Sequence, residues 1–179
     1  MSVERKEGKP GRFTFERVVS KAREFTLKEG GHIPVLIAQG SAGNVVMGME
    51  IPPEFRGERF DLMFAAGMEV AIGNRVGQLE EVFFVSEGWM SVAEEKPPMV
   101  PPSRDPKRIE VLQITGIEIT RDDRVQMQIF EMIRDRQGSL VDLTEFEGLK
   151  AHYEEGRAES PLLAAFLDGY RKGTGAPQN

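Results

Sequence analysis

The stretch that most constrains the fold of this chain is EVFFVSEGWMSV, residues Glu81 to Val92. It holds the most continuous apolar run and the only tryptophan, Trp89. A short apolar run rich in valine and phenylalanine is typical of a strand that is buried on both faces. We therefore predict a central sheet strand here, with Val82 to Val85 buried on both faces. Any functional site should lie at its Trp89 end.

Apolar residues at three- and four-residue spacing predict helices around this strand. The first helix begins at Thr14 and ends before Gly30; its stripe consists of Phe15, Val18, Val19, Ala22 and Phe25. The second runs from Glu58 to Ile72, where Gly67 would mark a close approach to the sheet. Ser160 and Pro161 open a third helix. The interaction stripe of this third helix is Leu162, Leu163, Phe166, Leu167 and Tyr170.

The remaining apolar segments predict strands. Residues 33–38 and 45–51 should pair as a hairpin, and so should residues 109–120 and 125–134. Residues 140–143 are open between strand and coil, and residues 144–155 are weakly helical in pattern. The result is an α+β fold with a five-stranded mixed sheet in ββαβββ order, preceded by one helix and followed by a helical C-terminal tail.

We expect a disordered lead over residues 1–12, a core domain over 13–137 and a C-terminal helical extension over 138–179 that packs on the core or on another subunit. The chain has no cysteine, so it forms no disulfide, and this fits a reducing compartment. It has no apolar run long enough for a membrane span and no secretory signal at its start. We therefore expect a cytoplasmic protein.

Charge bears on the choice of partner. The net charge of −6 argues against nucleic-acid binding as the main activity. However, residues 1–28 hold eight lysines or arginines and four glutamates. Such a basic segment is either the solvated face of a helix or an arm for an acidic partner such as nucleic acid.

The sequence lacks the motifs of several kinds of catalytic site. The sequence contains no P-loop, no GxGxxG fingerprint and no GxSxG elbow. Its two histidines, His32 and His152, lie on unrelated segments, so we expect no metal site and no cofactor. Paired carboxylates remain open, and if the protein is an enzyme we expect Glu87 and Asp105 to be catalytic. A glutamate beside an indole can have a raised pKa, although a solvent-exposed or arginine-paired Glu87 is the simpler interpretation.

A binding lip is the other candidate site near Trp89. The loop over residues 93–108 carries five prolines and should lie extended on the surface. Its polar side chains could form a binding lip for a ligand, or they could serve only to form turns. The candidate binding residues are Trp89, Ser91, Ser103 and Arg104.

The order of elements resembles the JAB/MPN metalloprotease fold over residues 14–135. The helix over 58–72 precedes the central strand, Gly88 and Trp89 stand where the family has GW, and Pro102 to Asp105 resembles its later PS…D segment. The family's metal-binding histidine pair is missing, since Met90, Ser91 and Val92 follow Trp89. Between the serine and the aspartate lies one residue, where the family has two. The glutamate that the family has at the start of the first strand is also absent. The resemblance therefore implies a metal-free member, and such members act as scaffolds.

These features favour a non-catalytic cytosolic interaction or structural protein of bacterial or phage type. It would act through self-association or through a protein partner, without a membrane. The alternative is a carboxylate-dependent hydrolase with its site near Glu87, Trp89 and the Pro97–Pro106 loop. An enzyme is the less favoured interpretation, because the sequence contains no complete set of catalytic residues.

Overall fold

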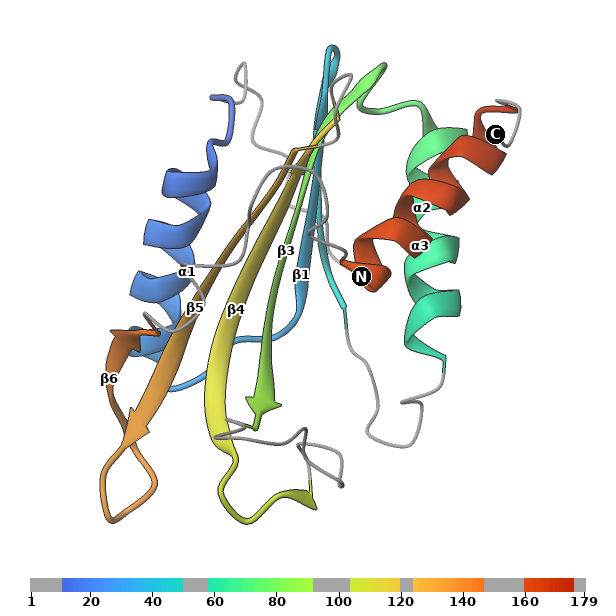
Figure 1. Cartoon of the computed structure of the whole chain (residues 1–179). Coiled ribbons are helices and arrows are strands. Elements are labelled where there is room, and N and C mark those ends of the chain that lie inside the picture. Colours follow the sequence, from blue (N-terminus) through green and yellow to red (C-terminus); the bar gives the residue numbers. More distant parts are fainter. Residues whose placement is uncertain (1–10, 50–57, 92–103, 120–123, 147–159, 176–179) are drawn as a thin grey trace.

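The computed structural model describes residues 11–49, 58–91, 104–119, 124–146 and 160–175. Over these ranges the chain is an α+β protein with one six-stranded antiparallel sheet, in the order β2-β1-β3-β4-β5-β6. Helix α1 covers one face of the sheet, and α2 and α3 cover the other (Figure 1). The elements are α1 (Phe15–Glu29), β1 (Val35–Gly40), β2 (Gly43–Gly48), α2 (Arg59–Gly73), β3 (Leu79–Met90), β4 (Ile109–Glu118), β5 (Arg124–Arg134), β6 (Leu140–Glu145) and α3 (Pro161–Gly173).

The predicted α+β class is confirmed, but the prediction of five strands in a mixed sheet is wrong. Residues 140–145 form a sixth strand, β6, which pairs with β5 and buries Leu143. Every pairing is antiparallel, since β3 returns from α2 to lie beside β1 in the opposite direction. Both predicted hairpins, β1–β2 and β4–β5, are confirmed. The weakly helical pattern predicted for residues 144–155 is wrong at Thr144 and Glu145, which belong to β6. Residues 147–155 lie outside the described ranges.

The central position of β3 is confirmed. It lies between β1 and β4, and Val82, Phe83, Phe84 and Val85 are exposed by only 0, 2, 6 and 2%. Because side chains alternate along a strand, its two faces supply two cores. Val82 and Phe84 join the core under α2 and α3, while Phe83 and Val85 join the core under α1.

Helix α1 begins and ends at the predicted residues. The Thr14 side chain accepts a hydrogen bond from the backbone N–H of Arg17, which satisfies a free donor of the first turn. Gly30 ends the helix with φ of 76°, a conformation that favours glycine. The predicted apolar stripe is correct except at Phe25, which is 47% exposed.

Helices α2 and α3 pack tightly against each other. Gly67 of α2 lies against the carbonyl oxygen of Phe166, and Gly169 of α3 lies against that of Phe64. The expectation that Gly67 approaches the sheet is therefore wrong, because the glycine approaches a helix. Ser160 precedes α3, as predicted, but its side chain makes no cap hydrogen bond.

The apolar stripe of α3 lies inside the core of its own chain. Leu163, Phe166 and Leu167 are buried under the sheet and α2, and Leu162 and Tyr170 pack beside them. The Tyr170 hydroxyl donates a hydrogen bond of 2.9 Å to the Gly77 carbonyl. Both β6 and α3, which follow residue 138, therefore pack with residues 13–137: β6 joins the sheet and the core under α1, and α3 joins the core on the other face.

Candidate functional site

The predicted site at the Trp89 end of β3 contains a cluster of charged side chains on the α1 face of the sheet. Trp89 pairs with Glu110 across β3 and β4, and Glu87 lies two residues before Trp89. These residues therefore share one face. A carboxylate oxygen of Glu87 accepts a hydrogen bond from the backbone N–H of His32. The cluster thus connects β3 and β4 to the chain that follows α1.

Arg134 holds this cluster together. Its guanidinium donates bonds of 2.6 and 2.8 Å to the two carboxylate oxygens of Glu110. It also donates to the carbonyls of Gly30 and Gly138, each at 3.2 Å. Such a bidentate, charge-assisted pair is among the stronger polar contacts of a protein. Arg134 therefore ties the end of α1 to strands β4 and β5, which is a structural role.

The pKa of the Glu87 carboxyl is raised. Partial burial raises the pKa of its carboxyl, while the His32 N–H works in the opposite direction. Glu110 raises the pKa of Glu87 further and Arg134 lowers it, so the charges that act on it come from this cluster and not from Asp105. Catalytic roles for Glu87 and Asp105 stay a prediction. Glu87 also lines neither of two cavities that lie within the described ranges.

Asp105 lies instead near Ser91. Its carboxylate accepts a bond of 2.8 Å from the Lys107 N–H. The Ser91 hydroxyl and this N–H lower the pKa of Asp105. Ser91 Oγ is buried and has no partner in hydrogen-bond geometry among the described residues, so it lies near Asp105 without forming a full bond. Arg104 is exposed, and Ser103 lies outside the described ranges.

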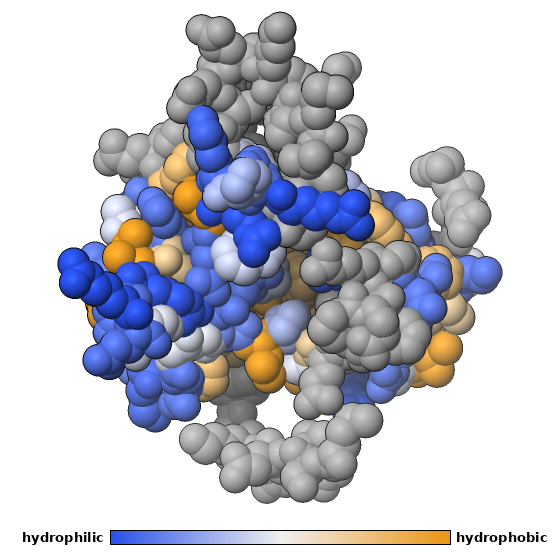
Figure 2. All heavy atoms as spheres, turned by 90° about the horizontal axis from the view of Figure 1, so that it is seen from below, coloured by the Kyte–Doolittle hydropathy of each residue, from blue (hydrophilic) through white to orange (hydrophobic). Residues whose placement is uncertain are grey.

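Trp89 is 45% exposed, and the Arg108 guanidinium stacks 4.4 Å from the centre of its ring. Viewed from this end of β3, the described surface is mostly hydrophilic and its hydrophobic residues form small separate patches (Figure 2). The structure thus brings Glu87, Trp89 and Ser91 to one end of the sheet, where the ion pair between Arg134 and Glu110 also lies. None of the three lines the two cavities described next.

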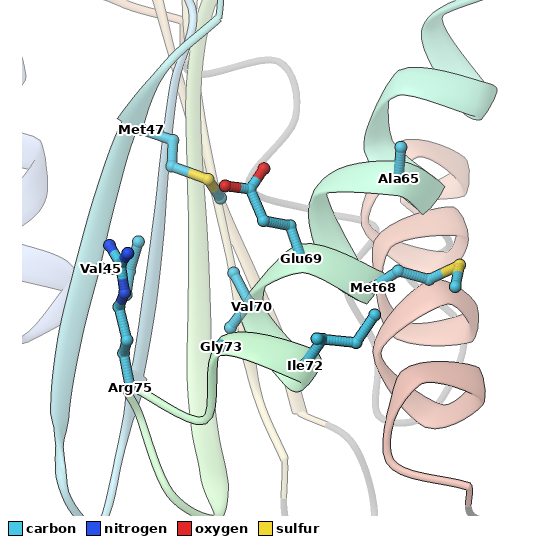
Figure 3. A pocket seen from close by; sticks show the side chains of 9 residues that line it. All are labelled: Val45, Met47, Ala65, Met68, Glu69, Val70, Ile72, Gly73 and Arg75. Atoms are coloured by element: carbon cyan, nitrogen blue, oxygen red, sulfur yellow. The ribbon is translucent and has the colours of Figure 1, made fainter. Parts of the chain in front are cut away.

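A cavity lies elsewhere, between the edge strand β2 and helix α2 (Figure 3). It has a volume of about 470 Å³, and most of its lining is apolar. Two charged residues, Glu69 and Arg75, contribute to its lining. The lining residues are Val45, Met47, Ala65, Met68, Glu69, Val70, Ile72, Gly73 and Arg75. We call this cavity the β2–α2 groove.

Among the described residues, strand β2 forms one edge of the sheet, beside this groove. Its sequence, GNVVMG, has no charged residue and no proline. Natural proteins usually protect edge strands with charges, proline, bulges or a covering segment, because unpaired N–H and C=O groups bind other strands. The opposite edge, β6, does carry such protection: Asp142 and Glu145 add charge, and the β5–β6 register shifts between Ile133 and Arg134.

The strand and the helix that form the groove were predicted from the sequence, but the groove itself was not. The signal that could have found it is the uncharged run from Gly43 to Gly48, which is unusual for an edge strand. That signal has meaning only once β2 is known to be at the edge. The position of β2 depends on the pairing of β1 with β3 across the whole of α2.

A second cavity of about 350 Å³ lies on the other face, between α1 and strands β1 and β3. Basic side chains of α1, Arg17, Lys21 and Lys28, contribute to its lining. Glu24 lies among them and forms a 2.6 Å ion pair with Lys21. Lys21 lowers the pKa of this exposed carboxyl. The mixture of charges gives this cavity no clear preference for an anion or a cation.

None of the described helices could cross a membrane. Within the described ranges, no three His, Cys, Asp or Glu side chains come together in a way that could hold a metal ion. No protein-family model, no curated protein and no solved structure matches this chain, so the resemblance to the JAB/MPN fold stays a prediction.

Proposed function

We propose that the protein is a non-catalytic, cytosolic interaction protein that binds a protein partner, or a copy of itself, along the β2–α2 groove. The observation that carries this proposal is the combination of an uncharged edge strand with an apolar cavity beside it. An extended segment that adds to a sheet edge gains main-chain hydrogen bonds from the edge and specificity from pockets for alternate side chains. The β2–α2 groove offers both features.

The exposed apolar residues near this edge support the proposal. Val46 of β2 is 55% exposed, and Ile72 of α2 is 69% exposed and lines the groove. Single exposed apolar side chains are common, but two of them beside the outward backbone groups of an edge strand are typical of an interaction surface. Strand addition would cover Val46 on one face of the sheet and fill the groove on the other face.

A photo-crosslinking amino acid at position 46 or 72, in cells that express the protein, tests this proposal. We expect covalent adducts with another protein chain from both positions. The matched control is position 141, because Val141 on the opposite edge strand is 56% exposed. Equal adduct formation from all three positions, or none from positions 46 and 72, would refute an interaction at this edge.

A carboxylate-dependent hydrolase is the second candidate, and the raised pKa of Glu87 is the observation that favours it. A carboxyl with a raised pKa can act as a general acid. The test is hydrolysis of a panel of chromogenic esters and glycosides by the purified chain, with Glu87→Gln as the variant. Turnover that disappears in the variant would support this candidate. Equal rates in both proteins, or no turnover at all, would count against it.

A further inference from the structure

The backbone of β2 and two charges beside it point to one occupant of the β2–α2 groove. We infer that it is a second copy of this chain, whose β2 pairs antiparallel with β2 around a two-fold axis through Val46. This inference rests on the proposed function and names its partner. It makes one continuous sheet from the two copies, and it fixes which residues face each other.

The direction of the backbone groups sets this register. The N–H of Met49 donates a bond of 2.7 Å to the Pro34 carbonyl, so the odd-numbered residues at this end of β2 point their backbone groups toward β1. Alternation along the strand then turns the groups of Asn44, Val46 and Gly48 toward the open edge. With Val46 opposite Val46 of the second copy, Asn44 faces Gly48 of that copy. All three outward-pointing residues therefore meet outward-pointing residues.

The side chains are compatible with this pairing. On the α2 face, Val45 of one copy lies opposite Met47 of the other, and both residues line the groove. On the α1 face, the two exposed Val46 side chains meet at the axis. Since no charge lies between Gly43 and Gly48, no like charges oppose each other across the two strands.

Charge complementarity favours a second copy over an unrelated strand. Arg75 lies at the Gly43 end of β2. A Cβ atom on Gly43 would lie 3.4 Å from the Arg75 carbonyl oxygen. Glu69 extends toward Met47, further along β2 (Figure 3). A two-fold axis through Val46 reverses the second strand, so Arg75 of each copy lies near Glu69 of the other. The same two residues thus form two complementary pairs.

The expected association is weak and concentration dependent. Pairing of five residues per strand, 44–48, covers less area than a typical stable interface, even with Ile72 and the groove residues included. Exposed ion pairs contribute little each and are screened by salt. We therefore expect a dimer whose dissociation constant rises with ionic strength.

Cysteine crosslinking tests the register, because the chain has no cysteine of its own. In the inferred dimer the two Cα atoms at position 46 lie about 5.5 Å apart, which is within the range of a disulfide. The variant Val46→Cys should therefore form a disulfide-linked dimer under mild oxidation. Asn44→Cys is the matched control, on the same face of the same strand. Its two copies would lie about 13 Å apart along the strands and should not crosslink alone.

A mixture of Asn44→Cys with Gly48→Cys should crosslink, because these positions face each other. Equal crosslinking of Val46→Cys and Asn44→Cys alone, or none in any arrangement, would overturn this register. Each variant's urea unfolding curve, compared with that of the wild type, shows whether it is folded.

Charge exchange tests the two ion pairs. Arg75→Glu and Glu69→Arg should each weaken dimerisation by about tenfold, because each places like charges together twice. The double variant should recover most of the loss. A double variant that is as weak as the single variants would overturn the pairing of Arg75 with Glu69.

The failure of this inference differs from the failure of the proposed function. If the full chain stays monomeric at high concentration while photo-crosslinks from positions 46 and 72 capture a different protein, the second copy is wrong and the interaction site stands. If neither self-association nor capture occurs at these positions, both are wrong.

Discussion

Gly67 of α2 and Phe166 of α3 touch through their backbones: a Cβ atom on Gly67 would clash with the Phe166 carbonyl oxygen and lie 2.8 Å from the Tyr170 nitrogen. Gly67→Ala should therefore lower the free energy of unfolding by about 3 kcal/mol, since the clash outweighs the roughly 1 kcal/mol that alanine gains in a helix. Urea unfolding measures this change. Gly88→Ala is the control, because a Cβ atom there has open space, and it should change stability by less than about 0.5 kcal/mol.

Phe166 of α3 is fully buried in the core that this helix forms with α2 and the sheet. Phe166→Ala should lower the free energy of unfolding by about 3–5 kcal/mol, through lost apolar burial and the cavity left behind. Phe60→Ala in α2 provides a comparison, because Phe60 is 49% exposed, and it should lose less than about 1 kcal/mol. Similar losses in the two variants would show that α3 is not part of the core of its own chain.

Arg134 should be far more important for stability than a surface ion pair. In Arg134→Lys the bidentate contact with Glu110 and the bonds to Gly30 and Gly138 cannot all form, and we expect a loss of about 1–2 kcal/mol. Lys21→Met removes the exposed pair with Glu24 and should cost less than about 0.5 kcal/mol. Denaturant unfolding of both variants tests the contrast, and equal losses would argue against a structural role for Arg134.

Glu87 predicts a pH dependence of stability. Because burial raises its pKa above 4.5, the folded state holds this proton more tightly than the unfolded state. The resulting stabilisation is present at acid pH and is lost as the pH rises through the raised pKa. Glu87→Gln cannot ionise and keeps an acceptor for the His32 N–H. Its stability relative to the wild type should therefore increase from acid to neutral pH, by less than about 1 kcal/mol because the carboxyl is only partly buried.

Glu24→Gln supplies the opposite sign, since Lys21 lowers the pKa of Glu24. Its stability relative to the wild type should fall as the pH rises toward neutral. Unfolding curves at a series of pH values separate the two trends. A flat difference between Glu87→Gln and the wild type would contradict the raised pKa of Glu87.

Local patterns predicted most elements of this fold. Thr14 and Gly30 mark the ends of α1 because capping depends on neighbouring residues alone, and the apolar run of β3 requires burial on both faces wherever the strand lies. Strand β6 was harder to predict, because of its six residues only Leu143 is buried, which leaves almost no hydrophobic pattern. The partner of Gly67 was likewise hidden, since a glycine shows that something is close but not which element it is.

The candidate site was predicted only in part. The shared face of Glu87 and Trp89 follows from the sequence, because alternation along a strand is a local property. The sequence does not reveal the role of Glu110 and Arg134, whose proximity to Glu87 depends on the β3–β4 and β4–β5 registers. The β2–α2 groove depends on the order of all six strands, which no local pattern contains.

Light scattering of Val46→Lys and Val141→Lys, at the same concentrations as the wild type, tests the central claim most directly. The two valines lie on opposite edge strands and are 55 and 56% exposed, so the substitutions differ only in the edge that they charge. We predict a concentration-dependent dimer for the wild type and for Val141→Lys, and a monomer for Val46→Lys, because a lysine blocks strand pairing at an edge. Dimerisation of Val46→Lys at the wild-type concentration, or its loss only in Val141→Lys, would contradict self-association through β2.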